Sequence, residues 1–154
     1  MINDLEVQRI HHADKLPDDT AIQRWVDAAL ADHGRDTELV VRIVDKAESA
    51  ELNQLYRHKS GPTNILSFPA DLPPELELNL LGDLVVCAPV LAQEALEQHK
   101  ALHDHWAHII IHGVLHLLGY DHLDEAEAEL MESQEIRILQ DLNIQNPYQQ
   151  DNDE

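Results

Sequence analysis

The sequence predicts a single layered α/β domain. Strand-like and helix-like segments alternate along the chain, and the last three elements are all helical. The 154 residues correspond to one domain, and an apolar content of 44% is enough for a buried core. We expect this domain to span residues 1–145, with a small mixed sheet of about four strands packed with about five helices. Residues 146–154 are polar and acidic and are expected to form a flexible tail.

Four segments have the composition of strands. Residues 5–10 alternate weakly between apolar and polar side chains, and residues 38–45 are rich in β-branched residues. Residues 63–69 read as a short strand. Residues 80–87 become apolar on both faces near their end, as expected of a strand that is covered on both sides.

Five segments are expected to be helical. The first begins after Pro17, where Asp18, Asp19 or Thr20 can cap it. The second covers residues 45–59 and ends in a basic tip, which a Gly-Pro pair follows. The other three are expected over residues 89–98, 103–118 and 124–142.

The helix over residues 103–118 carries the strongest chemical signal. His112 and His116 are four residues apart, so their imidazoles lie one turn apart on one helix face. Gly119 follows, where a left-handed C-terminal cap would turn the chain and bring His122 towards the pair. Three imidazoles with an open fourth position are typical of a catalytic zinc site. We therefore predict that these three histidines bind one divalent metal ion, Zn²⁺ or, since imidazole also suits it, Ni²⁺.

Two further histidines leave an alternative open. His105 and His108 continue the same stripe of the helix, and either one as a fourth ligand would make the site closed and structural. Closed zinc sites usually include cysteine, and this helix has none, so we expect His108 to support the site by packing or hydrogen bonding. Asp121 is interpreted either as a turn residue or as a side chain that holds an imidazole tautomer.

Position 113 separates this pattern from that of a metallopeptidase. In those enzymes a Glu follows the first histidine and acts as the general base, whereas this chain has Gly113. Asp83 is interpreted as a turn residue in preference to a base. Ser67 is interpreted as structural, because no His-Asp partnership is visible in the sequence. The general base is therefore unassigned.

The net charge of −20 is unevenly distributed. Residues 1–60 carry eight Lys or Arg against twelve Asp or Glu, and residues 61–154 carry two against eighteen. Such a field repels polyanions, so composition alone argues against a nucleic-acid binder. In this setting the basic tip with Arg57 and Lys59 is a candidate anion clamp, because an arginine donates two parallel bonds to a phosphate.

The sequence also predicts a cytoplasmic protein without a membrane partner. The single cysteine, Cys87, excludes an internal disulfide and is expected to be buried. The first residues lack the pattern of a signal peptide, and no run of eighteen apolar residues occurs.

Several blocks of the chain resemble the YbeY endoribonuclease family. Residues 112–122 match the H-G-x-L-H-L-x-G-Y-D-H signature, and the likeness extends over nearly the whole chain from residue 38. One variation is Asn64, where many members have Asp. The other matching blocks, in order, are Leu52-Asn53 with Tyr56-Arg57, residues 62–69, and Leu81-Gly82-Asp83.

The resemblance implies a metal-dependent, single-strand-specific endoribonuclease. Such an enzyme would act in ribosomal RNA maturation, chiefly at the 3′ end of small-subunit RNA, and in ribosome quality control. Its metal ligands would be His112, His116 and His122, and Arg57 would contact the RNA phosphate. The implied fold is a layered α/β domain with a small mixed sheet.

An endoribonuclease function requires a local positively charged groove. Two alternative functions also remain open. Single-stranded RNA requires basic side chains, which we expect Arg57, Lys59, Arg42 and Lys46 to supply. The expected partners are single-stranded ribosomal RNA and the small ribosomal subunit or its assembly factors, and not DNA. The alternatives are a metallopeptidase and a non-catalytic, metal-stabilised ribosome-assembly factor.

Overall fold

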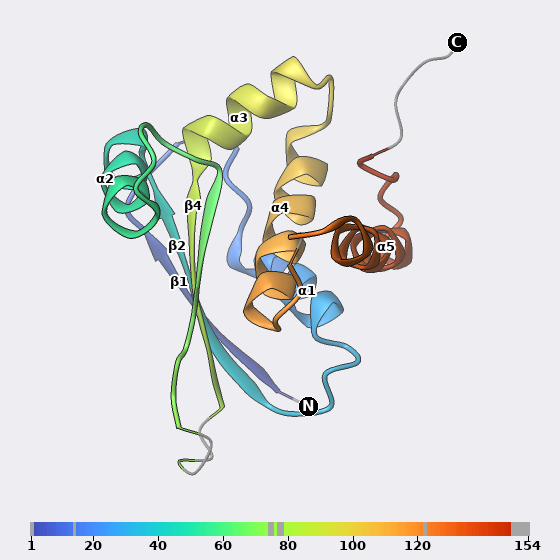
Figure 1. The fold of residues 1–154 in the computed structure, drawn as a ribbon. Coiled ribbons are helices and arrows are strands. Elements are labelled where there is room, and N and C mark those ends of the chain that lie inside the picture. Colours follow the sequence, from blue (N-terminus) through green and yellow to red (C-terminus); the bar gives the residue numbers. More distant parts are fainter. Residues whose placement is uncertain (1, 14, 74–75, 77–78, 122, 149–154) are drawn as a thin grey trace.

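A four-stranded mixed sheet lies at the centre of the fold (Figure 1). The computed structural model describes residues 2–13, 15–73, 76, 79–121 and 123–148. The strand order is β1-β2-β4-β3; β1, β2 and β4 are parallel, and β3 is antiparallel to β4. The strands are β1 (Asn3–Arg9), β2 (Thr37–Val44), β3 (Ile65–Pro69) and β4 (Leu80–Cys87).

Helices cover both faces of this sheet. In Figure 1, α2 lies against one face, α1 and α4 lie against the other, and α5 packs outside α4. The helices are α1 (Asp19–Ala29), α2 (Lys46–Arg57), α3 (Ala88–Glu97), α4 (Leu102–Leu117) and α5 (Glu125–Asp141). The predicted α/β class and the mixed sheet are therefore confirmed. None of the helices in the described ranges is long and apolar enough to cross a bilayer.

Aspartate caps fix where three of the helices begin. The side chains of Asp18, Asp45 and Asp124 each accept a hydrogen bond from the backbone N–H three residues later. These bonds satisfy amide groups that have no partner inside the helix, and the negative charge is favourable at a helix N-terminus. The starts of α1, α2 and α5 thus follow from local sequence.

The sheet has two apolar cores of unequal size. The larger lies between the sheet and α1 and α4, where Val41, Leu84 and Ile110 are fully buried. The smaller lies under α2 and contains Leu66 and Cys87. This arrangement explains why β4 is apolar on both faces near its end. Cys87 is buried as expected, and burial raises the pKa of its thiol.

Helix α4 approaches the sheet closely at Gly113. A Cβ atom added there would lie 2.6 Å from Ile65 Cδ1 and 2.9 Å from Leu84 Cδ2. Both contacts are far shorter than a normal carbon–carbon approach. Glycine at this position therefore allows α4 to lie directly on β3 and β4, and any side chain there would force Ile65 and Leu84 to shift.

We expect Gly113→Ala to lower the free energy of unfolding by about 1–3 kcal/mol through overpacking, partly offset by the roughly 0.5–1 kcal/mol that alanine gains within a helix. Urea unfolding followed by circular dichroism measures the change. Ile65→Val removes the Cδ1 atom nearest the new methyl group, so adding it to Gly113→Ala should recover part of the loss. A Gly113→Ala protein as stable as the wild type would show that Ile65 and Leu84 can shift without lowering the free energy of unfolding.

Candidate active site

Two of the predicted metal ligands lie side by side on α4. The imidazole rings of His112 and His116 have centroids 4.7 Å apart and are inclined by 82°. Both residues line a cavity of about 750 Å³ between α4, the tip of α2 and β3. The helical spacing therefore places both imidazoles at one open cavity.

The end of α4 turns the chain back as the glycine predicts. Gly119 has φ of +104°, and its N–H donates to His116 O at 3.0 Å. The N–H of Tyr120 donates to Leu115 O at 3.0 Å. This pair of bonds is the Schellman motif, which ends a helix with a left-handed residue. As a result, Gly119, Tyr120 and Asp121 line the same cavity as the two histidines.

The predicted third ligand, His122, lies outside the described residues. Within the described ranges, no three His, Cys, Asp or Glu side chains are grouped so that they could hold a metal ion. The predicted set includes His122, so the structure describes two of its three members. The donors it does describe, two adjacent imidazoles, fit a borderline metal such as zinc.

A buried carboxylate, Glu135 on α5, supports the histidine row. The residue is completely buried, and its Oε2 lies 3.1 Å from His112 Nδ1 while its Oε1 lies 2.6 Å from His108 Nε2. Burial alone would raise the pKa of this carboxyl, but hydrogen bonds from His108, His112 and Tyr148 lower it to about 2. The carboxylate is therefore ionised and accepts a hydrogen bond from the Nδ1–H of His112, which holds that ring in one orientation and one tautomer.

The contacts of His105 and His108 argue against a closed four-histidine site. His105 Nε2 lies 2.9 Å from Glu94 Oε1, and His108 Nε2 lies 2.6 Å from Glu135 Oε1. Burial lowers the pKa of His108 despite the neighbouring carboxylate, so this ring is neutral and donates from Nε2. In each ring, Nε2 is thus hydrogen-bonded to a glutamate carboxylate.

Glu135 is the residue that sequence reasoning missed. A signal was present, because Glu135 shares a helix face with the buried Met131, Ile138 and Leu139. An acid on the apolar face of a helix is rarely fully buried without a partner. In a segment with so many acidic residues, that position is easily read as one more exposed carboxylate.

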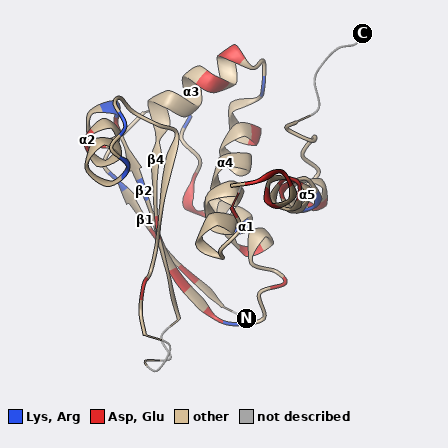
Figure 2. Ribbon diagram, viewed as in Figure 1, with Lys and Arg blue, Asp and Glu red and all other residues tan. Residues whose placement is uncertain are grey.

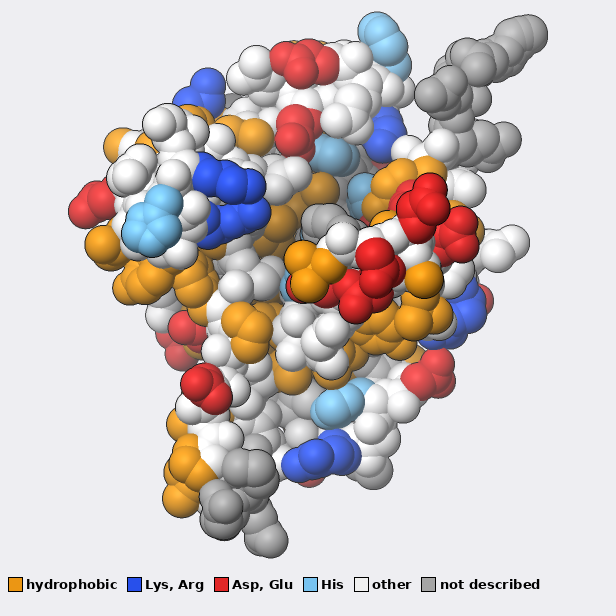
Figure 3. Space-filling model, viewed as in Figure 1, with side chains coloured by type: hydrophobic (Ala, Val, Ile, Leu, Met, Phe, Trp, Pro, Cys, Tyr) orange, Lys and Arg blue, Asp and Glu red, His pale blue; other side chains and the backbone are white. Residues whose placement is uncertain are grey.

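Arg57 lines the same cavity as the histidine pair, from a different helix. Helix α2 ends at this residue, and His58 follows in the left-handed conformation with φ of +57°. The Arg57 side chain is exposed and lines the cavity, and within the described part of the chain it forms no hydrogen bond or ion pair. Figure 3 shows basic side chains over the end of α2 and, across a hollow, acidic side chains over the start of α5.

The other predicted cations do not line this cavity. Arg42 on β2 is held by Glu48, with Nε–Oε2 at 2.5 Å, and by Gln8, with Nη1–Oε1 at 3.0 Å. The hydrogen bond that Arg42 donates to Glu48 raises the pKa of the guanidinium. Lys46 is the first residue of α2 and Lys59 lies two residues beyond its end, and neither lines the cavity. In Figure 2 the Lys and Arg positions are marked blue on and near α2. Of the four residues, Arg57 is the one that the structure places at the cavity.

Aromatic and hydroxyl side chains complete the cavity wall. The rings of Tyr56 and Phe68 meet edge to face, with centroids 5.1 Å apart, and Tyr56 is 59% exposed. Ser67 Oγ donates to Gly113 O at 3.4 Å and so joins β3 to α4, consistent with a structural role. Asp83, by contrast, is not among the residues that line the cavity.

An α/β domain in which paired imidazoles and an arginine line one open cavity is the arrangement expected of an enzyme that acts on an anionic substrate. Comparison with known proteins agrees with this class. The profile of the family described as "Endoribonuclease YbeY" matches residues 6–143. The chain belongs to the YbeY endoribonuclease family, as the resemblance predicted.

Relatives match along almost their full length. The proteins named Endoribonuclease YbeY from Pseudomonas entomophila (strain L48) and Pseudomonas putida (strain F1) are each 52% identical over 149 residues, which is 96% of this chain and 94% of theirs. Among solved structures, the solution structure of TM1509 from Thermotoga maritima matches with a TM-score of 0.60 and 22% identity, covering 97% of this chain and 99% of that one. The structural match supports the fold.

Proposed function

We propose that this protein is a metal-dependent endoribonuclease that cuts single-stranded ribosomal RNA. The observation that carries the proposal is that the His112–His116 pair and Arg57 line one cavity, in a chain of the YbeY family. Maturation of the 3′ end of small-subunit RNA and ribosome quality control are the proposed roles. The proposed partners are the small ribosomal subunit or its assembly factors, in the cytoplasm.

Three histidines would hold the proposed metal. His112 and His116 present adjacent imidazoles, and His122 would supply the third ligand. A divalent ion held there, Zn²⁺ or Ni²⁺, supplies a Lewis acid that polarises a phosphoryl oxygen or lowers the pKa of a bound water to about 7. The chain's own contribution is to hold the imidazoles in one orientation, which Glu135 does for His112.

The cavity wall provides the substrate contacts. Arg57 would donate two parallel hydrogen bonds to a phosphate and stabilise the negative charge that develops at phosphorus. Tyr56, which is exposed next to Arg57, offers a ring face on which an unpaired base can stack. A base inside a duplex has no free face, so this wall favours single strands.

A peptidase is disfavoured by the packing of α4. The position at which metallopeptidases carry their glutamate base is Gly113, and its Cα faces the side chains of Ile65 and Leu84. An acid there would begin against the sheet, and Ile65 and Leu84 would have to shift to admit it. The proposed reaction therefore takes its base from another group, which would accept the proton of the attacking water or, in a transesterification, of the attacking ribose 2′-OH.

We expect chelation to lower cleavage of a single-stranded ribosomal RNA fragment by at least about 100-fold, because a metal ion contributes several kcal/mol to stabilising the transition state. Added Zn²⁺ or Ni²⁺ should restore the activity, and mapping the product ends shows where the RNA is cut.

A duplex of the same sequence and a peptide library, digested in parallel, serve as controls and should stay intact. Cleavage that persists after chelation would refute the metal dependence. Cleavage of peptides alone would favour the peptidase. Binding to ribosomes without turnover of any RNA would favour the assembly factor.

A further inference from the structure

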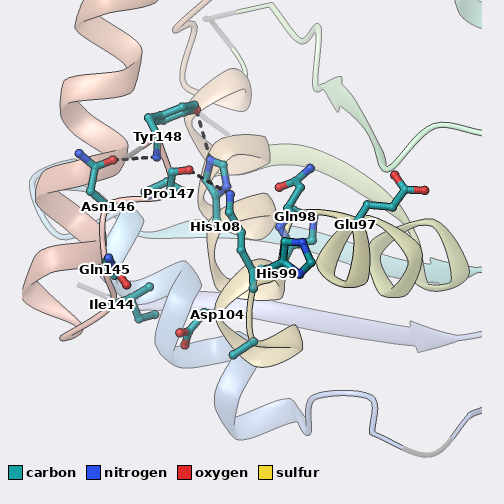
Figure 4. Close-up of a pocket in the computed structure, with 13 residues that line it drawn as sticks. Glu97, Gln98, His99, Asp104, His108, Ile144, Gln145, Asn146, Pro147 and Tyr148 are labelled. Atoms are coloured by element: carbon teal, nitrogen blue, oxygen red, sulfur yellow. Dashed lines mark hydrogen bonds between the residues drawn. The ribbon is translucent and has the colours of Figure 1, made fainter. Parts of the chain in front are cut away.

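The C-terminal segment folds back against the helix that carries the histidine row. Asn143 has φ of +62°, and the N–H groups of Asn143 and Ile144 donate to Gln140 O and Leu139 O, which ends α5 with a second Schellman motif. Further along, Tyr148 N–H donates to Asn146 Oδ1 at 2.8 Å, and Lys100 Nζ donates to Pro147 O at 3.0 Å. Figure 4 shows Asn146, Pro147 and Tyr148 beside His108 at one cavity, with the Tyr148–Asn146 hydrogen bond dashed. Tyr148 is thereby placed beside α4.

The Tyr148 hydroxyl reaches the buried carboxylate of α5. It donates to Glu135 Oε1 at 2.7 Å and lies 3.2 Å from His108 Nε2. The Tyr148 and His108 rings meet edge to face, with centroids 5.4 Å apart (Figure 4). Burial, and then the bond to Glu135, raise the pKa of the hydroxyl, so it stays protonated and acts as a donor.

Glu135 divides its two oxygens between different tasks. Oε1 accepts hydrogen bonds from both Tyr148 and His108, whereas Oε2 lies 3.1 Å from His112 Nδ1. Two donors on one oxygen fix the plane of the carboxylate, and the plane decides where Oε2 points. The direction of Oε2 in turn holds the His112 ring with its proton on Nδ1.

We infer that Tyr148 is a positioning residue for His112, acting through Glu135. The inference rests on the proposed function in one respect, because His112 matters as a ligand of the proposed metal. If Tyr148 has this role, the C-terminal segment helps to orient His112, although Tyr148 lies outside the cavity that Arg57 lines. The predicted flexible tail includes this segment; residues 149–154 lie outside the described residues.

Zinc affinity, measured by competition with a chromophoric chelator, tests the inference. Loss of an outer hydrogen-bond partner costs about 10–100-fold in metal affinity, which is the loss expected for Glu135→Leu. Tyr148→Phe removes one of the two donors to Oε1 and should weaken zinc binding by a smaller factor, up to about tenfold. Tyr148→Phe added to Glu135→Leu should have no further effect, because the hydroxyl then has no carboxylate to orient.

A second measurement uses the metal-free protein and so does not depend on the proposed metal. Nitrogen-15 NMR of the imidazoles, at about pH 8 where imidazole is ordinarily neutral, reports which nitrogen of His112 holds the proton. We expect Nδ1–H in the wild type and a mixture of tautomers in Tyr148→Phe. Circular dichroism of each variant separates this effect from unfolding.

The outcomes distinguish the two proposals. A folded Tyr148→Phe protein with unchanged zinc affinity and unchanged His112 tautomer overturns the positioning role. A wild type that binds no zinc overturns the proposed metal site, and the tautomer measurement then still supports or overturns the role of Tyr148. Equal losses from Tyr148→Phe in the wild-type and Glu135→Leu backgrounds would also overturn it, because the hydroxyl would then act by another route.

Discussion

Replacing His116 with alanine is expected to lower the rate of RNA cleavage by at least about 100-fold, with the fold retained. The proposed metal would lose one of three imidazole ligands, and with it the several kcal/mol that the ion contributes to stabilising the transition state. The helix itself should tolerate the change, since alanine is the best helix former and His116 is only partly buried. The measurements are the initial rate on a single-stranded oligonucleotide, the zinc content by elemental analysis and the circular dichroism spectrum.

A matched control for this variant lies on the same helix. His103 is an exposed histidine near the start of α4, where its ring packs edge to face on Trp25 with centroids 5.0 Å apart. His103→Ala should keep both cleavage and metal content. Because a contaminating nuclease would accompany both preparations equally, loss in His116→Ala alone assigns the activity to this protein. Unchanged cleavage in His116→Ala, with the control also active, would show that His116 plays no part in the reaction.

The site features that sequence could predict are those encoded over a few residues. The His112–His116 pair follows from helical spacing, and the turn after it follows from a glycine at the position that needs a positive φ. The caps at Asp18, Asp45 and Asp124 are local in the same sense. In each case the contact joins residues three to five positions apart, so no knowledge of the packing is needed.

The features that sequence could not predict depend on how helices pack. Glu135 meets His112 across 23 positions and His108 across 27, because α5 lies on α4. Its role can be recognised only when its burial is known, because in the sequence Glu135 looks the same as the exposed acidic residues around it. For Arg42 the missing information was the tertiary arrangement, in which β1 supplies Gln8 and α2 supplies Glu48 as partners of its guanidinium. Of the four residues predicted to form a basic groove, only Arg57 is among the described residues that line the cavity.

Arg57→Glu is the second variant with a large expected effect. In a chain of net charge −20, an RNA phosphate is repelled at long range and needs a local cation at the cavity. Arg57 lines the same cavity as the histidine pair and forms no ion pair within the described residues. Loss of one such donor costs about 10²–10³ in rate, and the new carboxylate adds repulsion. We expect cleavage to fall by at least that factor, with the zinc content unchanged.

Two further variants separate geometry from charge. Arg24→Glu changes the net charge of the chain by the same amount on α1, at an exposed position outside the cavity, and should leave cleavage nearly intact. Arg57→Lys keeps the charge but loses the planar fork, so its rate should fall between those of the wild type and Arg57→Glu. Single-turnover rates and substrate dissociation constants show whether the loss lies in binding or in the chemical step. If zinc content falls together with cleavage, Arg57 supports the metal site; if it does not, the arginine acts on the RNA.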